Sequence, residues 1–145
     1  MNIIITSAGQ RVSLIKSFQF ELKKIFPESK VFTTDLNPAL APACHISDGY
    51  FQVPKVTAEN YIDDLIKICI NNDINLIIPT IDTELLTLSN NEQKFKLNNI
   101  FPLVSDYEFI QKCGGGGFTN IFFVEINIEV FFFFLFIILY FFFFF

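Results

Sequence analysis

The loop that follows the first apolar run carries residue types suited to binding an anion. It spans residues 6–11 and contains Ser7, Gly9 and Arg11. Backbone N–H groups in such a loop attract negative charge together with the helix N-terminus behind it, and an arginine adds a forked cation for phosphate or carboxylate. The loop has neither the G-x-G-x-x-G nor the Walker A pattern. It is therefore a candidate substrate-binding loop, and the alternative is a tight turn with a solvent-facing Arg11.

A second polar group follows the apolar run at residues 76–78. Thr80, Asp82, Thr83 and Glu84 bring two hydroxyls and two carboxylates close together in the sequence. Such side chains orient a substrate or contact a neighbouring domain. Helix capping is the alternative, since Asp, Thr and Glu all favour a first helical turn. Capping explains only one or two of them, so Thr80, Asp82 and Glu84 are candidate substrate-binding residues.

Asp35 and Asn37 follow the run at residues 31–34, which is predicted to be the second strand of the chain. An acid at the end of the second strand holds ribose in dinucleotide-binding domains. The glycine fingerprint that accompanies it there is missing, so an acid that simply starts a turn is the competing interpretation. Both residues are kept as candidates for substrate binding. No catalytic residue is assigned, because His45 and the adjacent Cys44 lie in a predicted loop without a third group to orient them.

The elements that must position these residues alternate between strand and helix. Short runs of mainly apolar residues, the first of them entirely β-branched, predict strands of a parallel sheet at residues 3–5, 31–34, 50–53, 76–78 and 100–104. Apolar residues at helical spacing fill most intervals, with Thr57 as an expected N-cap and residues 37–42 as a breaker-rich loop. This order predicts a doubly wound, Rossmann-like α/β domain with a five-stranded parallel sheet, in which Pro102 requires an edge position for the last strand.

Charge and cysteine content exclude several classes of function. The chain has 10 Lys and Arg against 15 Asp and Glu, a net charge of −5, and no basic cluster for nucleic acid or anionic lipid. Its 3 cysteines have no C-x-x-C spacing, so neither a disulfide framework nor a zinc site is expected. The N-terminus has no signal-peptide pattern. We therefore expect a cytoplasmic protein without a metal site or a nucleic-acid partner.

Several segments, in chain order, resemble the opening of ATP-grasp ligases related to the carbamoyl-phosphate synthase large subunit. They are residues 1–16 (MNIIITSAGQRVSLIK), 34–38 (TDLNP), 41–43 (APA), 48–54 (DGYFQVP) and 77–85 (IIPTIDTEL). The resemblance extends to about residue 113. It implies that this stretch is the domain that precedes the ATP-grasp fold and shapes the acceptor-substrate side of the cleft.

The resemblance also implies a division of labour. In the family, ATP and Mg²⁺ are held by the two later domains, where a carboxylate is phosphorylated to an acyl phosphate that an amine or similar nucleophile attacks. None of those ligands can be placed in this sequence. The chain is therefore expected to be inactive alone, to bind no cofactor itself, and to have a small-molecule acceptor and the missing ATP-grasp domain as partners.

The C-terminal part departs from the family pattern. Gly114–Gly117 stand where the family has an Asp-Lys pair, and residues 114–130 look like a remnant of the next domain. Residues 131–145 are only Phe, Leu, Ile and one Tyr. This tail is shorter than the roughly 18–20 residues that span a bilayer, and it is interpreted as an aberrant low-complexity segment.

We thus expect one domain at residues 1–113, truncated before the ATP-grasp domain. Two alternatives stay open. The chain is a free-standing nucleotide- or sugar-nucleotide-binding module, or it is a small membrane-tethered protein with the Phe-rich tail as its anchor.

Overall fold

The computed structural model of the chain describes residues 1–105, 107 and 110. The chain separates into two compact units, Met1–Tyr107 and Glu108–Phe145, and all but one of the described residues belong to the first. The expected domain boundaries at 113/114 and 130/131 lie outside the described residues and stay predictions.

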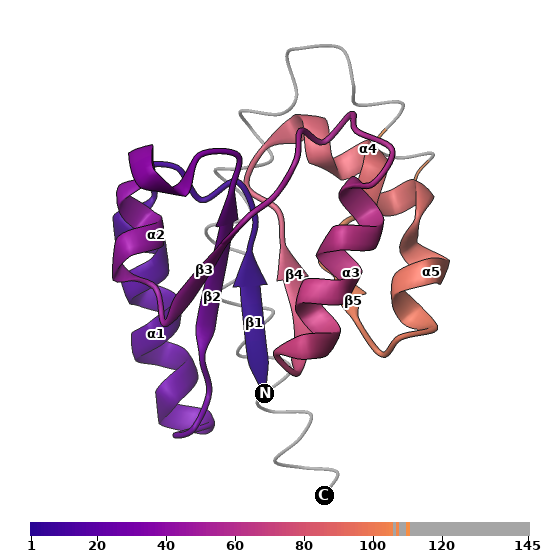
Figure 1. The fold of residues 1–145 in the computed structure, drawn as a ribbon. Coiled ribbons are helices and arrows are strands. Elements are labelled where there is room, and N and C mark those ends of the chain that lie inside the picture. Colours follow the sequence, from indigo (N-terminus) through magenta and orange to yellow (C-terminus); the bar gives the residue numbers. More distant parts are fainter. Residues whose placement is uncertain (106, 108–109, 111–145) are drawn as a thin grey trace, which may run out of the picture. The chain divides into compact units, whose positions relative to one another are not determined.

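Five parallel strands form a sheet in the order β3-β2-β1-β4-β5 (Figure 1). The strands are β1 (Asn2–Ile5), β2 (Val31–Asp35), β3 (Gly49–Gln52), β4 (Ile74–Ile78) and β5 (Phe101–Pro102). The chain builds outward from β1 to β3 and then returns to place β4 against the other side of β1. The strand order reverses between β1 and β4, and such a switch point is where an open parallel sheet binds ligands. The predicted doubly wound α/β fold is confirmed.

Helices cover both faces of the sheet because successive strand residues point to opposite sides. They are α1 (Val12–Ile25), the 3₁₀ helix η1 (Pro38–Leu40), α2 (Pro42–Ile46), α3 (Tyr61–Asn71), α4 (Asp82–Asn90) and α5 (Glu92–Lys96). Residues of α1 and α2 share a core with Ile3 and Ile5, whereas residues of α3, α4 and α5 share one with Ile4 and Ile77. Figure 1 shows the two groups of helices on opposite sides of β1. None of the helices in the described part of the chain is long and apolar enough to cross a membrane.

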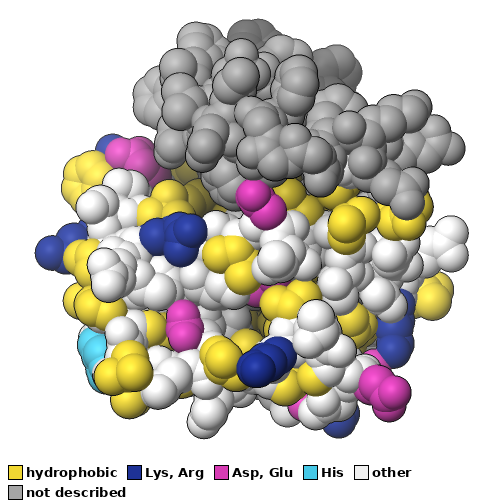
Figure 2. Space-filling model, turned by 90° about the horizontal axis from the view of Figure 1, so that it is seen from above, with side chains coloured by type: hydrophobic (Ala, Val, Ile, Leu, Met, Phe, Trp, Pro, Cys, Tyr) yellow, Lys and Arg dark blue, Asp and Glu magenta, His cyan; other side chains and the backbone are white. Residues whose placement is uncertain are grey.

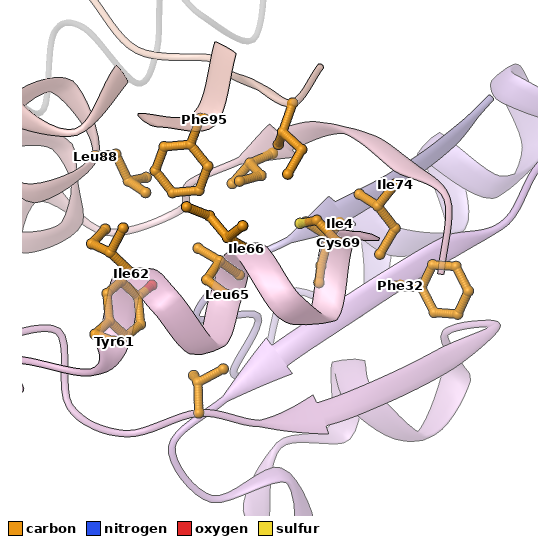
Figure 3. Close-up of a cluster of buried hydrophobic side chains, with 13 residues drawn as sticks. Ile4, Phe32, Tyr61, Ile62, Leu65, Ile66, Cys69, Ile74, Leu88 and Phe95 are labelled. Atoms are coloured by element: carbon orange, nitrogen blue, oxygen red, sulfur yellow. The ribbon is translucent and has the colours of Figure 1, made fainter. Parts of the chain in front are cut away.

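The core beneath α3 fixes this helix against the sheet (Figure 3). Tyr61, Leu65 and Cys69 are spaced four residues apart, so they lie on one side of the helix, and all three are fully buried. They pack in one cluster with Ile4 of β1 and Phe95 of α5. The first residue of this stripe, Tyr61, carries a hydroxyl into the otherwise apolar cluster, and its partner is part of the site described below.

The region predicted as a breaker-rich loop, residues 37–42, is helical in part. It contains η1, and α2 starts at Pro42. Pro38 and Pro42 each occupy the start of a helix, where the N–H that proline lacks has no helical partner anyway. Because α2 continues to Ile46, His45 lies on a helix and not in the predicted loop.

The start of α3 also differs from the prediction. Its N-cap is Asn60 and not Thr57. The reason is a pair of turns before the helix, in which the Ala58 N–H donates to the Lys55 carbonyl and the Tyr61 N–H donates to the Ala58 carbonyl. The short helix α5 was not predicted, since five residues are too few to show a helical period.

The last strand is shorter than predicted, with two residues instead of residues 100–104. It lies at the edge of the sheet, the position that Pro102 requires, and this part of the prediction is confirmed. Proline has no N–H to donate to the ladder, and the next contact is made by the Leu103 N–H, which donates to the Ile77 carbonyl at 2.8 Å.

Candidate functional site at the switch point

The loops after β1 and β4 lie side by side because their strands are neighbours. Ile5 pairs with Ile78 at the ends of the strands, and the Thr6 N–H donates to the Ile78 carbonyl at 3.0 Å. Beyond this point the Thr80 hydroxyl oxygen lies 2.8 Å from the carbonyl oxygens of both Thr6 and Ser7. The two loops are therefore tied together where the strand order reverses. Residues 6–11 are called the β1 loop below.

Arg11 adds a second tie between the same loops. Its Nη1 donates to the Ser7 carbonyl at 3.2 Å, and its Nη2 donates to the Thr80 carbonyl at 2.8 Å. The residue is exposed, so the guanidinium spans the two loops at the surface. A guanidinium has five N–H donors, and these two bonds leave further donors for a carboxylate or phosphate of a ligand.

Glu84 is the buried centre of this arrangement. It comes from the first turn of α4 and is 1% exposed. Its carboxylate accepts hydrogen bonds from the hydroxyls of Thr6 (2.5 Å), Ser7 (2.5 Å) and Tyr61 (3.0 Å). A buried carboxylate needs such donors, because it has lost its contact with water. One side chain thus joins α4, the β1 loop and α3.

Burial dominates the electrostatics of this carboxyl group. Desolvation raises the pKa of Glu84, while the hydrogen bonds from Ser7, Thr6 and Tyr61 and the positive charge of Arg11 act in the opposite direction. The pKa of the Tyr61 phenol is also raised, first by burial and then by the adjacent charge of Glu84. Tyr61 therefore remains a hydroxyl donor at physiological pH.

We expect the Glu84 carboxyl to make the protein less stable as pH rises. Its folded-state pKa lies above the ordinary value of 4.5, so the folded state binds the proton more tightly than the unfolded chain does. The stability that this group contributes is fully present below pH 4.5 and is lost as pH rises through the folded-state pKa. Urea unfolding of the wild type and of Glu84→Gln, measured between about pH 4 and about pH 8, isolates this effect.

The free energy of unfolding of the wild type, relative to that of Glu84→Gln, is expected to decline over this interval. Glu92→Gln is a suitable control, because Glu92 forms a surface ion pair with Lys96 and should leave the pH dependence nearly unchanged. A difference between wild type and Glu84→Gln that is flat, or that grows with pH, contradicts a raised pKa.

The backbone of the β1 loop takes a conformation that these hydrogen bonds support. Ser7 and Gly9 both have φ of +50°. Glycine adopts this region without strain, whereas a residue with a side chain loses about 1–2 kcal/mol there. The bond from the Ser7 hydroxyl to Glu84 offsets that cost. The conformation at Ser7 therefore depends on a residue of another element.

Asp35 holds the β1 loop from the β2 side. Its two carboxylate oxygens accept hydrogen bonds from the backbone N–H groups of Gly9 (3.0 Å) and Asn37 (2.9 Å). The second bond is typical of an aspartate that starts a turn, which was the competing interpretation of this residue. Direct contact of Asp35 or Asn37 with a substrate stays a prediction.

Most backbone N–H groups of the β1 loop are used inside the protein. The loop donors with acceptors among the protein oxygens are the N–H groups of Thr6, Ala8, Gly9 and Arg11. A phosphate cradle needs several N–H groups that point outward together. The loop geometry therefore argues against phosphate binding by the backbone, and it leaves the Arg11 guanidinium as the group suited to an anion.

The structure brings most of the predicted site residues together at one edge of the sheet. Hydrogen bonds connect Ser7, Arg11, Thr80 and Glu84 in one network, and a second set of bonds connects Gly9, Asp35 and Asn37 on the other side of the same loop. Asp82 is exposed in the first turn of α4 and takes no part in the bonds of this network. Figure 2 looks down on the molecule from the side to which β1 points, and charged side chains of both signs are scattered there among hydrophobic ones.

Two members of the network were not among the predicted site residues. They are Thr6, which belongs to the candidate loop at residues 6–11, and Tyr61, which lies on the apolar side of α3. A tyrosine in the first turn of an apolar helix was the available signal, because a buried tyrosine hydroxyl usually has a hydrogen-bond partner. Here that partner is Glu84.

Nucleophile and metal sites are not evident in the described residues. No group of three His, Cys, Asp or Glu side chains there is placed to hold a metal ion. Cys44 and Cys69 are buried free thiols, and burial raises the pKa of both, that of Cys69 to about 12. His45 is exposed and meets the Tyr50 ring edge-on. Cys113 lies outside the described residues.

Residues 3–103 match the family described as "PylC-like, N-terminal domain". The match covers well over half of the chain and includes both loops of the site. The chain belongs to the PylC-like N-terminal domain family. This family is an N-terminal domain of ATP-grasp ligases, so the family-level resemblance in the sequence is confirmed. A closer relation of this PylC-like domain to carbamoyl-phosphate synthase stays a prediction.

Two solved structures illustrate the fold of the PylC-like domain in larger proteins. Glycinamide-RNase-transformylase T from Mycobacterium tuberculosis is 10% identical with a TM-score of 0.51, over 77% of this chain and 30% of that chain. A single-chain, multi-domain long-chain acyl-CoA carboxylase is 14% identical with a TM-score of 0.54, over 77% of this chain and 11% of that chain. At these identities the likeness shows the fold alone, and the chain spans a minor part of either protein. No significant match is found among curated proteins.

Proposed function

We propose that the chain is the N-terminal, substrate-side domain of an ATP-dependent ligase, and that it is inactive alone. The ligase joins a carboxylate to an amine or a similar nucleophile through an acyl phosphate. Membership of residues 3–103 in an N-terminal domain family of ATP-grasp ligases carries the proposal. The site supports it, because the two loops at the switch point hold Arg11 at the surface and most backbone N–H groups of the β1 loop donate to acceptors within the protein.

In this function the guanidinium of Arg11 binds an anionic group of the acceptor substrate. It is held on the Ser7 and Thr80 carbonyls before any ligand arrives, so it loses little freedom on binding. Gly9 and the residues around it shape the loop beneath. Asp82, exposed at the start of α4, is the candidate contact for a positively charged group of the acceptor.

ATP and Mg²⁺ belong to the later ATP-grasp domain in this proposal. The described residues do not fit either group, since no group of three His, Cys, Asp or Glu side chains among them could hold a metal ion and most of the β1-loop N–H groups have protein acceptors. No step of phosphoryl transfer is therefore assigned to these side chains. The ATP-grasp domain and a small-molecule acceptor are the proposed partners. The free thiols of Cys44 and Cys69 are in keeping with a cytoplasmic location.

The response of this chain to Mg-ATP tests the assignment. We expect no ATP hydrolysis and no rise in Tm at millimolar Mg-ATP. A ligand at one hundred times its Kd stabilises the folded state by about 2.7 kcal/mol, which a thermal melt detects. The same melt with a sugar nucleotide is the matched comparison. A reproducible upward shift with either ligand would contradict the proposal and support a free-standing nucleotide-binding module.

A further inference from the structure

The surroundings of Glu84 give it a role other than substrate contact. Its carboxylate is buried, with 1% of the residue exposed, and it accepts hydrogen bonds from three hydroxyl groups. Two of the three donors, Thr6 and Ser7, are consecutive residues of the β1 loop. The third, Tyr61, is anchored in the core beneath α3. The carboxylate is thus fixed by Tyr61, which belongs to the core, and it binds the hydroxyls of two loop residues.

We infer that Glu84 is a positioning residue, which sets the shape of the β1 loop and through it the place of Arg11. The inference rests on the proposed function of Arg11 at the acceptor site. Only Ser7 lies between Glu84 and Arg11. The Ser7 hydroxyl donates to Glu84 at 2.5 Å, and the Ser7 carbonyl accepts from Arg11 at 3.2 Å.

The backbone at Ser7 makes this path sensitive to Glu84. At φ of +50° the residue occupies a region that serine rarely adopts, so the conformation persists only while other contacts support it. Besides Glu84, two groups contact the Ser7 carbonyl, namely the Arg11 guanidinium at 3.2 Å and the Thr80 hydroxyl at 2.8 Å. Loss of the carboxylate removes the hydrogen bonds of both Thr6 and Ser7. The loop then relaxes, and the carbonyl that holds Arg11 moves with it.

Hydrogen exchange of the full chain, read by mass spectrometry on short peptides, tests this inference without a substrate. Four backbone N–H groups of the loop, those of Thr6, Ala8, Gly9 and Arg11, are protected by the acceptors described above only while the loop keeps its shape. Glu84→Gln keeps the size of the side chain, but its amide group replaces one of the two acceptor oxygens by a donor. We expect exchange in residues 6–11 to become about tenfold faster or more, with residues 74–78 of β4 unchanged.

Two further variants make the result specific. Ser7→Ala removes one donor to the carboxylate and is expected to speed exchange in residues 6–11 as well. If Glu84 acts on the loop through Ser7, the double variant exchanges no faster than Glu84→Gln alone. Glu92→Gln, on the surface of α5, is the control and leaves the loop unchanged.

Three outcomes would overturn the inference. They are unchanged exchange in the loop of both single variants, additive effects in the double variant, and equal acceleration in every peptide. The last outcome would mean that Glu84 only holds the fold together. If Glu84→Gln fails to fold, Ser7→Ala alone decides by whether it loosens the loop selectively. The exchange experiment contains no acceptor substrate, so its outcomes can be interpreted even if the ligase proposal fails.

Discussion

Residues 1–113 expressed alone are expected to be soluble and to unfold cooperatively, whereas residues 1–145 are expected to aggregate. The two buried clusters of the sheet and its helices lie within residues 1–104, so the shorter chain keeps the whole described core. Residues 131–145 add only uncharged apolar side chains, most of them Phe. Uncharged segments with strong β-propensity and neither Pro nor Gly are typical of aggregating strands.

The two chains are compared by the fraction that stays in solution after centrifugation, followed by urea unfolding of the soluble material. A matched control replaces residues 131–145 by a Gly/Ser segment of equal length and is expected to stay soluble, which assigns the effect to composition. Insertion of the long chain into membranes, with release only by detergent, would contradict the prediction. It would support the membrane-tethered alternative instead.

Arg11→Ala and Asp82→Ala are expected to lower turnover by about a hundredfold or more once the chain is joined to an ATP-grasp domain. Arg11 carries the positive charge that spans the two loops of the switch point, and Asp82 is the exposed carboxylate at the start of α4. A displacement of the acceptor by about 1 Å is enough to cost this much in rate. The measurement is ADP release with a panel of acceptors, together with a thermal melt that checks the fold.

Two matched variants separate positioning from loss of charge. Lys16→Ala removes an exposed cation from α1, the helix that begins directly after Arg11, and is expected to keep wild-type kinetics. Arg11→Lys keeps the charge but not the planar fork that reaches two carbonyls, so it is expected to remain impaired. If Arg11→Ala and Asp82→Ala both retain wild-type kinetics with every acceptor, these residues are only a surface charge and a helix-capping group.

The sheet was predictable because its strands are marked by local composition. The apolar runs at residues 3–5 and 76–78 are the patterns of strands buried on both faces, and both form inner strands of the sheet. Pro102 even indicated which strand lies at the edge. Helices of five residues or fewer, such as α2 and α5, were not predicted because they are shorter than two helical turns.

The sequence indicated at which edge of the sheet the site residues lie, but not whether each side chain points into the protein or toward solvent. Strand ends indicated which residues meet, since the carboxyl ends of parallel strands share one edge. Whether Glu84 points outward or inward depends on Tyr61 and Thr6, which are 23 and 78 residues away in the sequence. An acid in a first helical turn usually stays in water near the helix N-terminus, so local rules favoured the wrong direction.

The central place of β1 has a consequence for synthesis on the ribosome. β1 is the first strand to emerge, yet one of its two neighbours, β4, and the carboxylate that closes the loop after β1 are encoded much later. The Thr6–Glu84 contact spans 78 residues, which at about 5–20 residues per second takes about 4–16 seconds to translate. For most of that interval, until β4 is made, the nascent chain presents one edge of Ile3–Ile5 unpaired, a surface that invites pairing with another strand. Protection of that edge by a chaperone would be needed most in the seconds before β4 leaves the exit tunnel.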